Sequence, residues 1–213
     1  MAKNQHSIAG LILAGGRGER LGGVIKSELV LGGVRLLERV AERLRACSPL
    51  LTGHGRIDPV ALHLLADMIA VPDLDGDYAG PLAGLAGAIA YLNALATPPE
   101  LLVSVAVDTP FLPADFVTRL LEGLGEAPAA VAAYDGQPYP TNAIWRVARF
   151  RDLPERVRAG TAPRSLKSLC SAAQGLTIEW PKSAAGDPFA NVNTPEDLAN
   201  LQLRVATAGS LRD

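Results

Sequence analysis

Three cations and five glycines lie close together near the start of the chain, and this combination suits phosphate binding. The stretch 8–26 begins as an apolar run, IAGLILA, and then becomes a glycine-rich loop with Arg17, Arg20 and Lys26. A strand that ends in glycines and cations can bring backbone N–H groups and positive charge to one point. The alternative is a tight turn with solvated charges, but five glycines within nine residues favour an anion site.

The spacing of this loop excludes two common phosphate-binding loops. A dinucleotide fingerprint beginning at Gly16 and Gly18 requires a third glycine at position 21, where Leu21 stands. A P-loop ending at Lys26 requires glycine at position 25, where Ile25 stands. The loop is therefore of another kind, and a dehydrogenase is disfavoured.

An aspartate follows the strongest predicted strand. The run LLVSVAV, residues 101–107, is apolar almost throughout and is followed by Asp108. Open α/β sheets bind ligands beyond the carboxyl ends of their strands, and a carboxylate there suits Mg²⁺ carried by nucleotide phosphates. The alternative for Asp108 is a helix N-cap or a turn residue. Because Asp108 accompanies the opening loop, we favour the metal-binding interpretation.

Two asparagines precede the last predicted helix. Thr194 as N-cap, Pro195 in the first turn and Asp197 at the third position form a sound helix start. That start does not explain Asn191 and Asn193. Amides on an extended segment can point into a cleft, so both are candidates for ligand binding.

Strands and helices are predicted to alternate along the whole chain. The predicted strands are 8–14, 49–53, 68–71, 101–107, 129–133, 141–145 and 176–180, with 141–145 crossing the end of the sheet after a turn at 136–140. The predicted helices are 34–46, 60–67, 82–94, 114–124, 146–159 with a break near Pro154, a short helix opened by 162–165, and one from 195. This order favours a single α/β domain over residues 1–213, with a core of about 6–205 and a mixed, mainly parallel sheet.

Composition narrows the class of protein further. A net charge of −2 over 213 residues argues against a protein that coats nucleic acid. The N-terminal MAKNQHS is too polar for a signal peptide, and no apolar run reaches about 18 residues, so we expect a soluble, cytoplasmic protein. Cys47 and Cys170 form no CxxC pair, which disfavours a structural disulfide in that compartment.

The motifs resemble those of the nucleotidyltransferases and, within them, the molybdenum cofactor guanylyltransferases. The matching segments are Leu13-Ala14-Gly15-Gly16, Arg20-Leu21-Gly22-Gly23 with Lys26, Asp77-Tyr78-Ala79-Gly80-Pro81-Leu82-Ala83-Gly84, Asp108-Thr109-Pro110, and the run from Phe189 to Leu198. They cover both ends and the middle of the chain in the family's order. The resemblance implies a three-layer Rossmann-like nucleotidyltransferase domain.

The resemblance also implies a reaction and its partners. GMP would pass from GTP to the terminal phosphate of molybdopterin, with release of pyrophosphate and with Mg²⁺ as cofactor. Cofactor-insertion proteins and molybdoenzyme chaperones are further candidate partners, whereas nucleic acid and membranes are not expected. The opening Gly-Gly resembles the branch that uses guanine, because relatives that use cytidine tend to have Ala-Ala-Gly.

Roles follow for individual residues. The residues implied to bind the nucleotide are Leu13, Ala14, Gly15, Gly16, Lys26, Asp77 and Asp108. Arg20 and Lys26 would neutralise the triphosphate, and Asp108 would hold Mg²⁺, so these three are the implied catalytic residues. Asp77 would accept a hydrogen bond from guanine or ribose. Asn191 and Asn193 would face the pterin.

The chain departs from the family pattern at three places. Ile25 stands where the family has an acidic residue, and Tyr139 stands where it usually has histidine. The segment 51–56 keeps only Arg56 of the family's Asn-x-Asn-Arg. Two alternatives therefore stay open: a related nucleotidyltransferase that uses another nucleotide or a sugar phosphate, and a non-catalytic nucleotide-binding protein.

Overall fold

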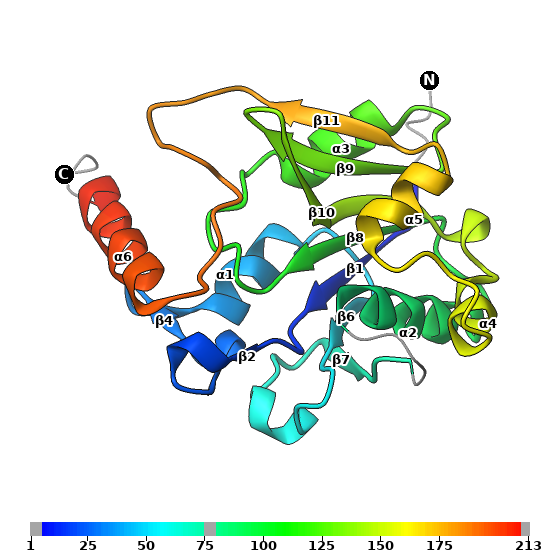
Figure 1. Cartoon of the computed structure of the whole chain (residues 1–213), viewed down its shortest axis with the longest axis horizontal. Coiled ribbons are helices and arrows are strands. Elements are labelled where there is room, and N and C mark those ends of the chain that lie inside the picture. Colours follow the sequence, from blue (N-terminus) through cyan, green and yellow to red (C-terminus); the bar gives the residue numbers. More distant parts are fainter. Residues whose placement is uncertain (1–5, 75–79, 210–213) are drawn as a thin grey trace.

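Seven strands form one sheet through the centre of the molecule (Figure 1). The computed structural model describes residues 6–74 and 80–209, without the side chains of Arg17, Ala208 and Gly209. In sheet order the strands are β11 (Leu176–Trp180), β9 (Ala129–Tyr134), β10 (Gln137–Arg146), β8 (Leu101–Ala106), β1 (Ile8–Leu13), β6 (Leu50–Gly53) and β7 (Met68–Val71). β10 is antiparallel to β8 and β9, and the other pairings are parallel. The predicted mixed, mainly parallel sheet is confirmed.

The central strands are apolar because both faces of the sheet are covered. Every residue of β8 is buried, as in parallel sheets packed between two helical layers. On β1, Leu11 packs in the cluster on one face and Ile12 in the cluster on the other. This alternation follows from the two-residue period of a strand.

Helices cover both faces and complete the three layers. One face carries α2 (Pro81–Asn93), α4 (Leu153–Arg158) and α5 (Leu166–Ala172), whose apolar residues share a cluster with the strands. The other face carries α1 (Leu36–Arg43) and α3 (Phe116–Leu124). The two cysteines are free and buried, Cys170 in the first cluster and Cys47 in the second. The predicted three-layer α/β/α arrangement is confirmed.

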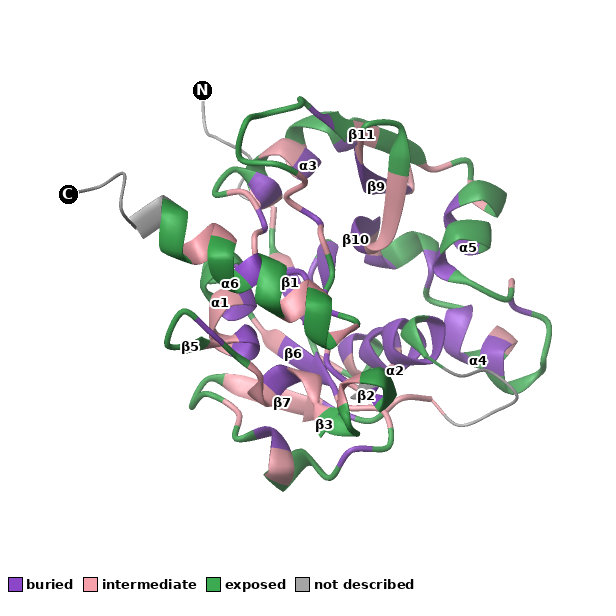
Figure 2. Ribbon diagram, turned by 60° about the vertical axis from the view of Figure 1, so that its left-hand side comes forward, coloured by how far each residue is buried: buried purple, intermediate pink, exposed green. Residues whose placement is uncertain are grey.

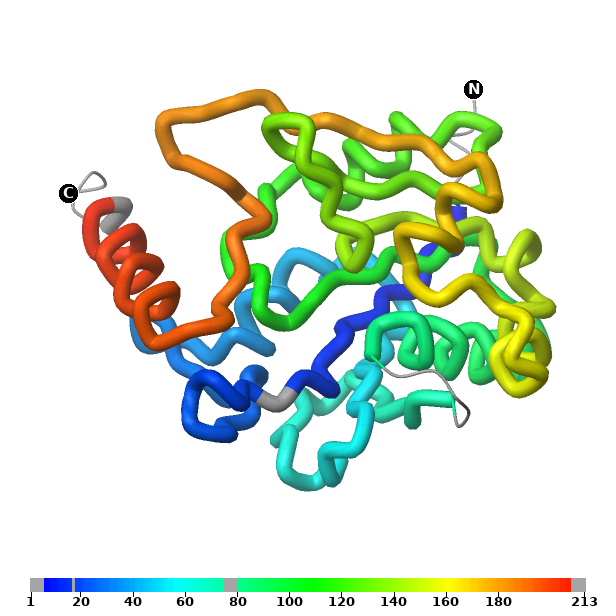
Figure 3. The backbone as a smooth tube through the Cα atoms, viewed as in Figure 1, coloured from blue at the N-terminus to red at the C-terminus, as the bar shows by residue number. Residues whose placement is uncertain are grey.

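The last helix packs away from these layers, beside residues 30–35 (Figure 1). α6 (Pro195–Gly209) contacts β4 (Val30–Leu31), which pairs with β5 (Val34–Arg35). Gln202 of α6 donates to the carbonyl of Val30 at 3.0 Å. Figure 3 shows the blue opening segment and the orange-to-red final segment meeting at one end of the molecule. Figure 2 shows α2 buried along most of its length, whereas α6 exposes much of its surface.

The position of β10 corrects one expectation. The segment 141–145 was predicted to cross the end of the sheet, but it lies inside the sheet, between β8 and β9. The predicted turn at 136–140 is wrong beyond Gly136, because β10 begins at Gln137. Asp135 and Gly136 have positive φ angles of 53° and 74°, as a two-residue type I′ hairpin turn requires. That turn makes β10 antiparallel to β9.

Four predicted helices are shorter than expected, and the one predicted over 114–124 begins at Phe116. In place of a helix over 60–67 there is one 3₁₀ turn, η3 (Pro59–Leu62), which ends where His63 adopts a φ of 42°. In place of a helix over 146–159, β10 runs to Arg146 and is followed by the 3₁₀ turn η4 (Val147–Arg149) and α4. Pro154 lies in the first turn of α4, where proline is tolerated, and therefore marks a start rather than a break. The helix predicted over 34–46 begins two residues later because β5 precedes it.

The glycine-rich loop folds into small units that periodicity does not predict. They are β2 (Arg17–Gly18), the 3₁₀ turn η1 (Glu19–Leu21), β3 (Val24–Ile25) and the 3₁₀ turn η2 (Lys26–Glu28). β2 pairs with β3 and sets Ile25 opposite Arg17. The half-buried Ile25 packs on the apolar cluster of α1 and α3, so it anchors the hairpin that precedes Lys26. Within 6–74 and 80–209, no helix has the length and apolar character needed to cross a membrane.

Candidate functional site

A cavity of about 760 Å³ opens at the carboxyl ends of the central strands. The lining residues are Leu13, Gly15, Gly16, Glu19, Lys26, Gly53, Gly55, Arg56, Asp73, Leu74, Gly80, Pro81, Ala83, Ala106, Val107, Asp108, Thr141 and Asn191. Most of them end or follow β1, β6, β7 and β8 or begin α2, whereas Thr141 belongs to β10 and Asn191 lies between β11 and α6. This is the edge of an open α/β sheet at which ligands bind.

Most of the predicted site residues meet at this cavity. Leu13, Gly15, Gly16, Lys26, Asp108 and Asn191 line it. Asn193 reaches it indirectly, through a contact with Lys26. Ala14 is fully buried and does not line the cavity; its N–H donates to the Gly53 carbonyl at 2.8 Å. Arg20 is exposed on η1 and is not a lining residue, and Asp77 lies outside the described residues.

Lys26 connects three segments that are far apart in the sequence. Its Nζ donates to Asp108 Oδ2 at 2.6 Å and to Asn193 Oδ1 at 2.7 Å. The Lys26 and Asp108 side chains are only 11% and 15% exposed, so their charges are weakly screened by solvent. Opposite charges are thus arranged side by side at the mouth of a cavity, as anion and metal binding both require.

The segment with the two asparagines is fixed to the sheet by its backbone. Val192 is fully buried, and its N–H donates to the carbonyl oxygen of Asp108 at 3.0 Å. Further along, Asp197 Oδ2 accepts from the N–H groups of Asn193 and Thr194, both at 2.9 Å. The hydrogen bond from the Asn193 backbone is the main cause of the lowered pKa of Asp197. The predicted helix start at 194–197 is confirmed, with Thr194 Oγ1 accepting from the N–H of Asp197 at 3.1 Å.

Tyr139 holds the same segment at its other end. The Tyr139 hydroxyl donates to Asp187 Oδ2 at 2.6 Å, and Asp187 Oδ1 accepts from the N–H of Phe189 at 2.8 Å. The rings of Tyr139 and Phe189 lie 5.1 Å apart. Burial, followed by the contact with Asp187, raises the pKa of Tyr139, so the hydroxyl stays a proton donor. Tyr139, a departure from the family pattern, therefore has a structural role in placing 187–193.

Asp73 is a site residue that the sequence reasoning missed. It lines the cavity just after β7, and its Oδ1 accepts from the N–H of Gly55 at 3.0 Å. Burial raises its pKa above the ordinary value of 3.8, with the Gly55 hydrogen bond acting in the opposite sense. Asp73 stands after its strand much as Asp108 stands after β8, so the same positional rule could have found it.

Glycines bring two loops together at the wall of the cavity. A Cβ atom on Gly15 would lie 2.7 Å from the Cα of Gly55, closer than real Cβ contacts allow. Gly55 also has a φ of 58°, which favours glycine. The loop after β1 thus packs directly on the loop after β6. The segment 51–56 contributes the glycines Gly53 and Gly55 and the exposed Arg56 to the lining.

A buried amide positions the turn that carries Asp108. Asn142 Oδ1 accepts from the N–H of Ala106 at 3.1 Å, and Thr109 Oγ1 donates to the carbonyl of Ala106 at 2.6 Å. Both side chains are fully buried. The neutral hydrogen bonds fix the end of β8 without adding charge to the site. Asn142 gave no sequence signal because it lies within a strand.

Asp108 suits a divalent cation that arrives with a nucleotide. Among the described residues no group of three or more His, Cys, Asp or Glu side chains could hold a metal ion. Mg²⁺ keeps several waters and needs only one or two carboxylates besides phosphate oxygens. Asp108, a half-buried carboxylate at the cavity, fits that requirement.

The N-terminus of α2 adds a second feature suited to anions. α2 begins at Pro81 and runs for 13 residues, and Gly80, Pro81 and Ala83 line the cavity. The first turn of a helix offers backbone N–H groups and the positive end of its dipole. The cavity therefore combines cations, carboxylates and the N-terminus of a helix.

Comparison with known proteins places this arrangement in a family. Residues 10–175 match the family described as MobA-like NTP transferase domain. A "Molybdenum cofactor guanylyltransferase" of Bradyrhizobium sp. (strain ORS 278) is 34% identical over 200 residues, which are 92% of this chain and 92% of that protein. The crystal structure of molybdopterin-guanine dinucleotide biosynthesis protein A from Archaeoglobus fulgidus has a TM-score of 0.64 and 22% identity, and the match covers 94% of this chain and 99% of that one.

A further solved structure is a Mycobacterium tuberculosis H37Rv protein in complex with manganese. Its TM-score is 0.65 at 17% identity, and the match covers 93% of this chain and 98% of that one. These structural likenesses confirm the predicted Rossmann-like nucleotidyltransferase fold. The family match over 10–175 and the 34% identical relative show that the chain belongs to the molybdenum cofactor guanylyltransferase family of MobA-like nucleotidyltransferases.

Proposed function

We propose that this enzyme transfers GMP from GTP to the terminal phosphate of molybdopterin and releases pyrophosphate. The observation that carries the proposal is the contact of Lys26 with both Asp108 and Asn193 at one cavity. This contact brings together in one site the glycine-rich stretch 8–26, the carboxylate of Asp108, which is suited to a metal, and the segment 191–193. The function named for relatives that are 34% identical over 92% of this chain supports the same reaction.

The chemistry requires charge and position rather than an activated side chain. A phosphate monoester has a second pKa of about 6 and is already an anion at neutral pH. Its oxygen forms a bond to the α-phosphorus of GTP, and the bond from that phosphorus to the β-phosphate oxygen breaks. Pyrophosphate leaves with the electron pair. The barrier lies in bringing several anions together and in stabilising charge on the transferring group.

Lys26 and Asp108 would supply most of that stabilisation. Lys26 would exchange its contact with Asp108 for phosphate oxygens, and the N-terminus of α2 would add N–H donors. Asp108 would hold Mg²⁺, which would neutralise charge on the phosphates. Gly15 and Gly16 would let the nucleotide approach the backbone. Arg20, exposed on η1, would act only as an outer cation for the triphosphate.

Asp73 is our candidate for recognition of guanine. Guanine presents two neighbouring N–H donors, N1–H and the N2 amino group, and an ionised carboxylate accepts both. Asp73 lies at the cavity, and its orientation is fixed by Gly55. Gly53 and Gly55 have no side-chain amide to offer, so selectivity would depend on Asp73. Asp77, given this role on family resemblance, stays a second candidate.

The molybdopterin side would be formed by the segment 191–193. Asn191 lines the cavity, and Arg56 offers a cation at the same cavity for the acceptor's phosphate. Asn193, expected to face the pterin, would instead act mainly through Lys26, given their 2.7 Å contact. The guanylated product would then pass to cofactor-insertion proteins or molybdoenzyme chaperones in the cytoplasm.

Thermal unfolding with each common nucleoside triphosphate, with and without Mg²⁺, tests the nucleotide half of this proposal. A ligand at about 100 times its Kd stabilises a protein by about 2.7 kcal/mol. We expect GTP with Mg²⁺ to give the largest rise in Tm. Equal shifts with CTP or ATP would contradict guanine selectivity. A shift with GTP but no pyrophosphate with molybdopterin would identify a non-catalytic nucleotide-binding protein.

A further inference from the structure

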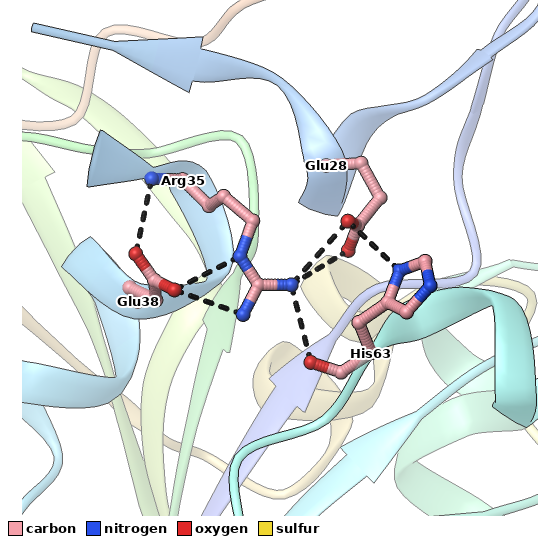
Figure 4. Close-up of polar contacts among 4 residues, drawn as sticks. All are labelled: Glu28, Arg35, Glu38 and His63. Carbon is pink, nitrogen blue, oxygen red and sulfur yellow. Dashed lines mark hydrogen bonds and ion pairs between the residues drawn. The ribbon is translucent and has the colours of Figure 1, made fainter. Parts of the chain in front are cut away.

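A partly buried arginine, Arg35, contacts Glu28 of η2 and is not among the residues that line the cavity. Figure 4 shows the Arg35 guanidinium between the carboxylates of Glu28 and Glu38, beside His63. Arg35 Nη1 donates to Glu28 Oε1 at 3.1 Å and to the His63 carbonyl at 3.1 Å, and Nε donates to Glu38 Oε1 at 2.9 Å. His63 Nδ1 lies 3.1 Å from Glu28 Oε2. One side chain thus joins three separate segments.

Glu28 connects this cluster to Lys26. Both residues belong to η2, a single 3₁₀ turn of three residues. The residue between them, Ser27, is fully buried. The next residue, Leu29, donates from its N–H to the Lys26 carbonyl at 3.2 Å. A shift of Glu28 must therefore shift the backbone of Lys26, because so short a turn has no independent parts.

The same cluster fixes the end of η2 against α1. The N–H of Leu36 donates to the carbonyl of Leu29 at 2.8 Å, directly beside Arg35. Glu38 also accepts from the backbone N–H of Arg35 at 3.3 Å and so holds the start of α1. The hydrogen bond from Arg35 is the main cause of the lowered pKa of Glu38.

We propose that Arg35 is a positioning residue for Lys26, which it holds in register with the phosphates of the nucleotide through Glu28. The inference rests on the proposed function in one respect, that Lys26 meets nucleotide phosphates. A flexible lysine binds phosphate as a point charge, so its effect depends on where its backbone is held. Displacements of about 1 Å are enough to lower catalysis markedly.

The planar fork of arginine is needed for this role. Arg35 reaches Glu28 with one terminal nitrogen and Glu38 with Nε and the other terminal nitrogen. Lysine has one ammonium and cannot occupy both positions at once. Arg35→Lys should therefore restore only part of the function that Arg35→Met removes.

A matched control lies close by. Arg45 pairs with Glu42 at 2.9 Å, but the two side chains are 78% and 60% exposed, and within the described residues neither forms a hydrogen bond or ion pair with η2. Exposed pairs of this kind contribute little to stability. Arg45→Met removes the same kind of side chain without disturbing the support of Lys26.

The test measures the Kd of Mg·GTP by calorimetry on the full chain, with no acceptor present. We expect Arg35→Met to raise the Kd by about 10-fold, the effect of about one weakened charge-assisted hydrogen bond. Arg35→Lys should give an intermediate value, and Arg45→Met should leave the Kd unchanged. If Arg35→Met does not fold, Glu28→Ala removes the same link, retains the pair of Arg35 with Glu38, and should raise the Kd similarly.

A double-mutant cycle separates positioning from general stability. If Arg35 acts through Lys26, Arg35→Met should change the Kd by less than about 2-fold when Lys26 is already glutamine. If Arg35→Met raised the Kd by the same factor in the wild type and in the Lys26→Gln variant, the inference would be overturned. An unchanged Kd for Arg35→Met in the wild-type background would also overturn it. Either result would leave the proposed function standing. A wild-type chain that binds no nucleoside triphosphate would overturn the proposed function as well.

Discussion

The Lys26 ammonium lies 2.6 Å from the Asp108 carboxylate, although the two residues are 82 positions apart in the sequence. The contact is possible because β1 and β8 are neighbours in the sheet and end at the same edge. The loop that follows each of these strands therefore reaches the cavity. Lys26 and Asp108, which indicate little when taken separately, thus form a charged pair suited to a nucleotide and its metal.

Asp108→Asn should abolish nucleotidyl transfer while the fold is retained. The amide keeps the size of the carboxylate but lacks the charge that Mg²⁺ and Lys26 require. We expect a loss of at least about 100-fold in pyrophosphate release, typical for removal of one electrostatic group. Circular dichroism and Tm serve as the control for folding. Full activity in this variant would remove Asp108 as the metal ligand.

Substitution of Asn193 should weaken the binding of GTP, whereas substitution of Asn191 should weaken the use of molybdopterin. Asn193 accepts from Lys26 at 2.7 Å, so Asn193→Ala should raise the Kd of Mg·GTP. Asn191 lines the cavity without a contact of that kind among the described residues, so Asn191→Ala should raise the KM for molybdopterin and leave the Kd of GTP unchanged. Identical effects of the two variants on GTP would contradict this division of roles.

Asp73→Asn should reduce the preference for guanine. Inosine triphosphate lacks the N2 amino group, so it reports the contact directly. We expect the wild-type chain to bind GTP more tightly by about 10-fold or more, the range for a hydrogen bond to a charged group, and the variant to bind both equally. An unchanged preference in the variant would exclude Asp73 from base recognition.

The same residue gives a pH dependence. Burial raises the pKa of Asp73 above 3.8, and only the ionised carboxylate accepts two N–H donors. GTP affinity relative to that of inosine triphosphate should therefore fall as pH is lowered through this raised pKa. Because both nucleotides carry the same phosphates, their ratio cancels phosphate protonation. A ratio that stays constant across the acidic range would argue against the contact.

The carboxylate of Asp197 at the start of α6 should make the free energy of unfolding fall as pH is lowered. A buried acid with a raised pKa would have the opposite effect. The pKa of Asp197 lies below its ordinary value of 3.8, chiefly because the Asn193 N–H donates to it. Its contribution is complete above 3.8 and is lost as pH falls through the lowered pKa. Urea unfolding should show Asp197→Asn destabilised at neutral pH, with the difference from wild type shrinking in acid. A difference that grows in acid would contradict this assignment.

Much of the sheet could be predicted because its strands carry a strong local signal. The run 101–107 is apolar on both faces, and only a strand covered by helices on both sides has that pattern. The place of β10 could not be predicted in this way, since its register depends on the turn at Asp135 and Gly136 and on both neighbouring strands. The short units between Arg17 and Glu28 carry no periodicity at all.

Site residues that belong to a motif could be predicted from the spacing of that motif. Those whose position depends on tertiary packing could be predicted less well. Lys26, Asp108 and Asn193 were expected in one site, and Lys26 contacts both of the others. Asp73 was overlooked because the family resemblance assigned the nucleotide contact to Asp77. Arg20 was expected at the triphosphate but is exposed on η1 and does not line the cavity.

The transfer reaction itself tests the central claim most directly. The chain, Mg²⁺ and molybdopterin are incubated with GTP or, as the matched nucleotide, with CTP, and both pyrophosphate and the nucleotide-linked molybdopterin are measured. We expect one pyrophosphate for each guanylated product, with GTP preferred over CTP by at least about 10-fold. Product formed equally well or better from CTP, or no product from GTP that is bound, would contradict guanylyl transfer.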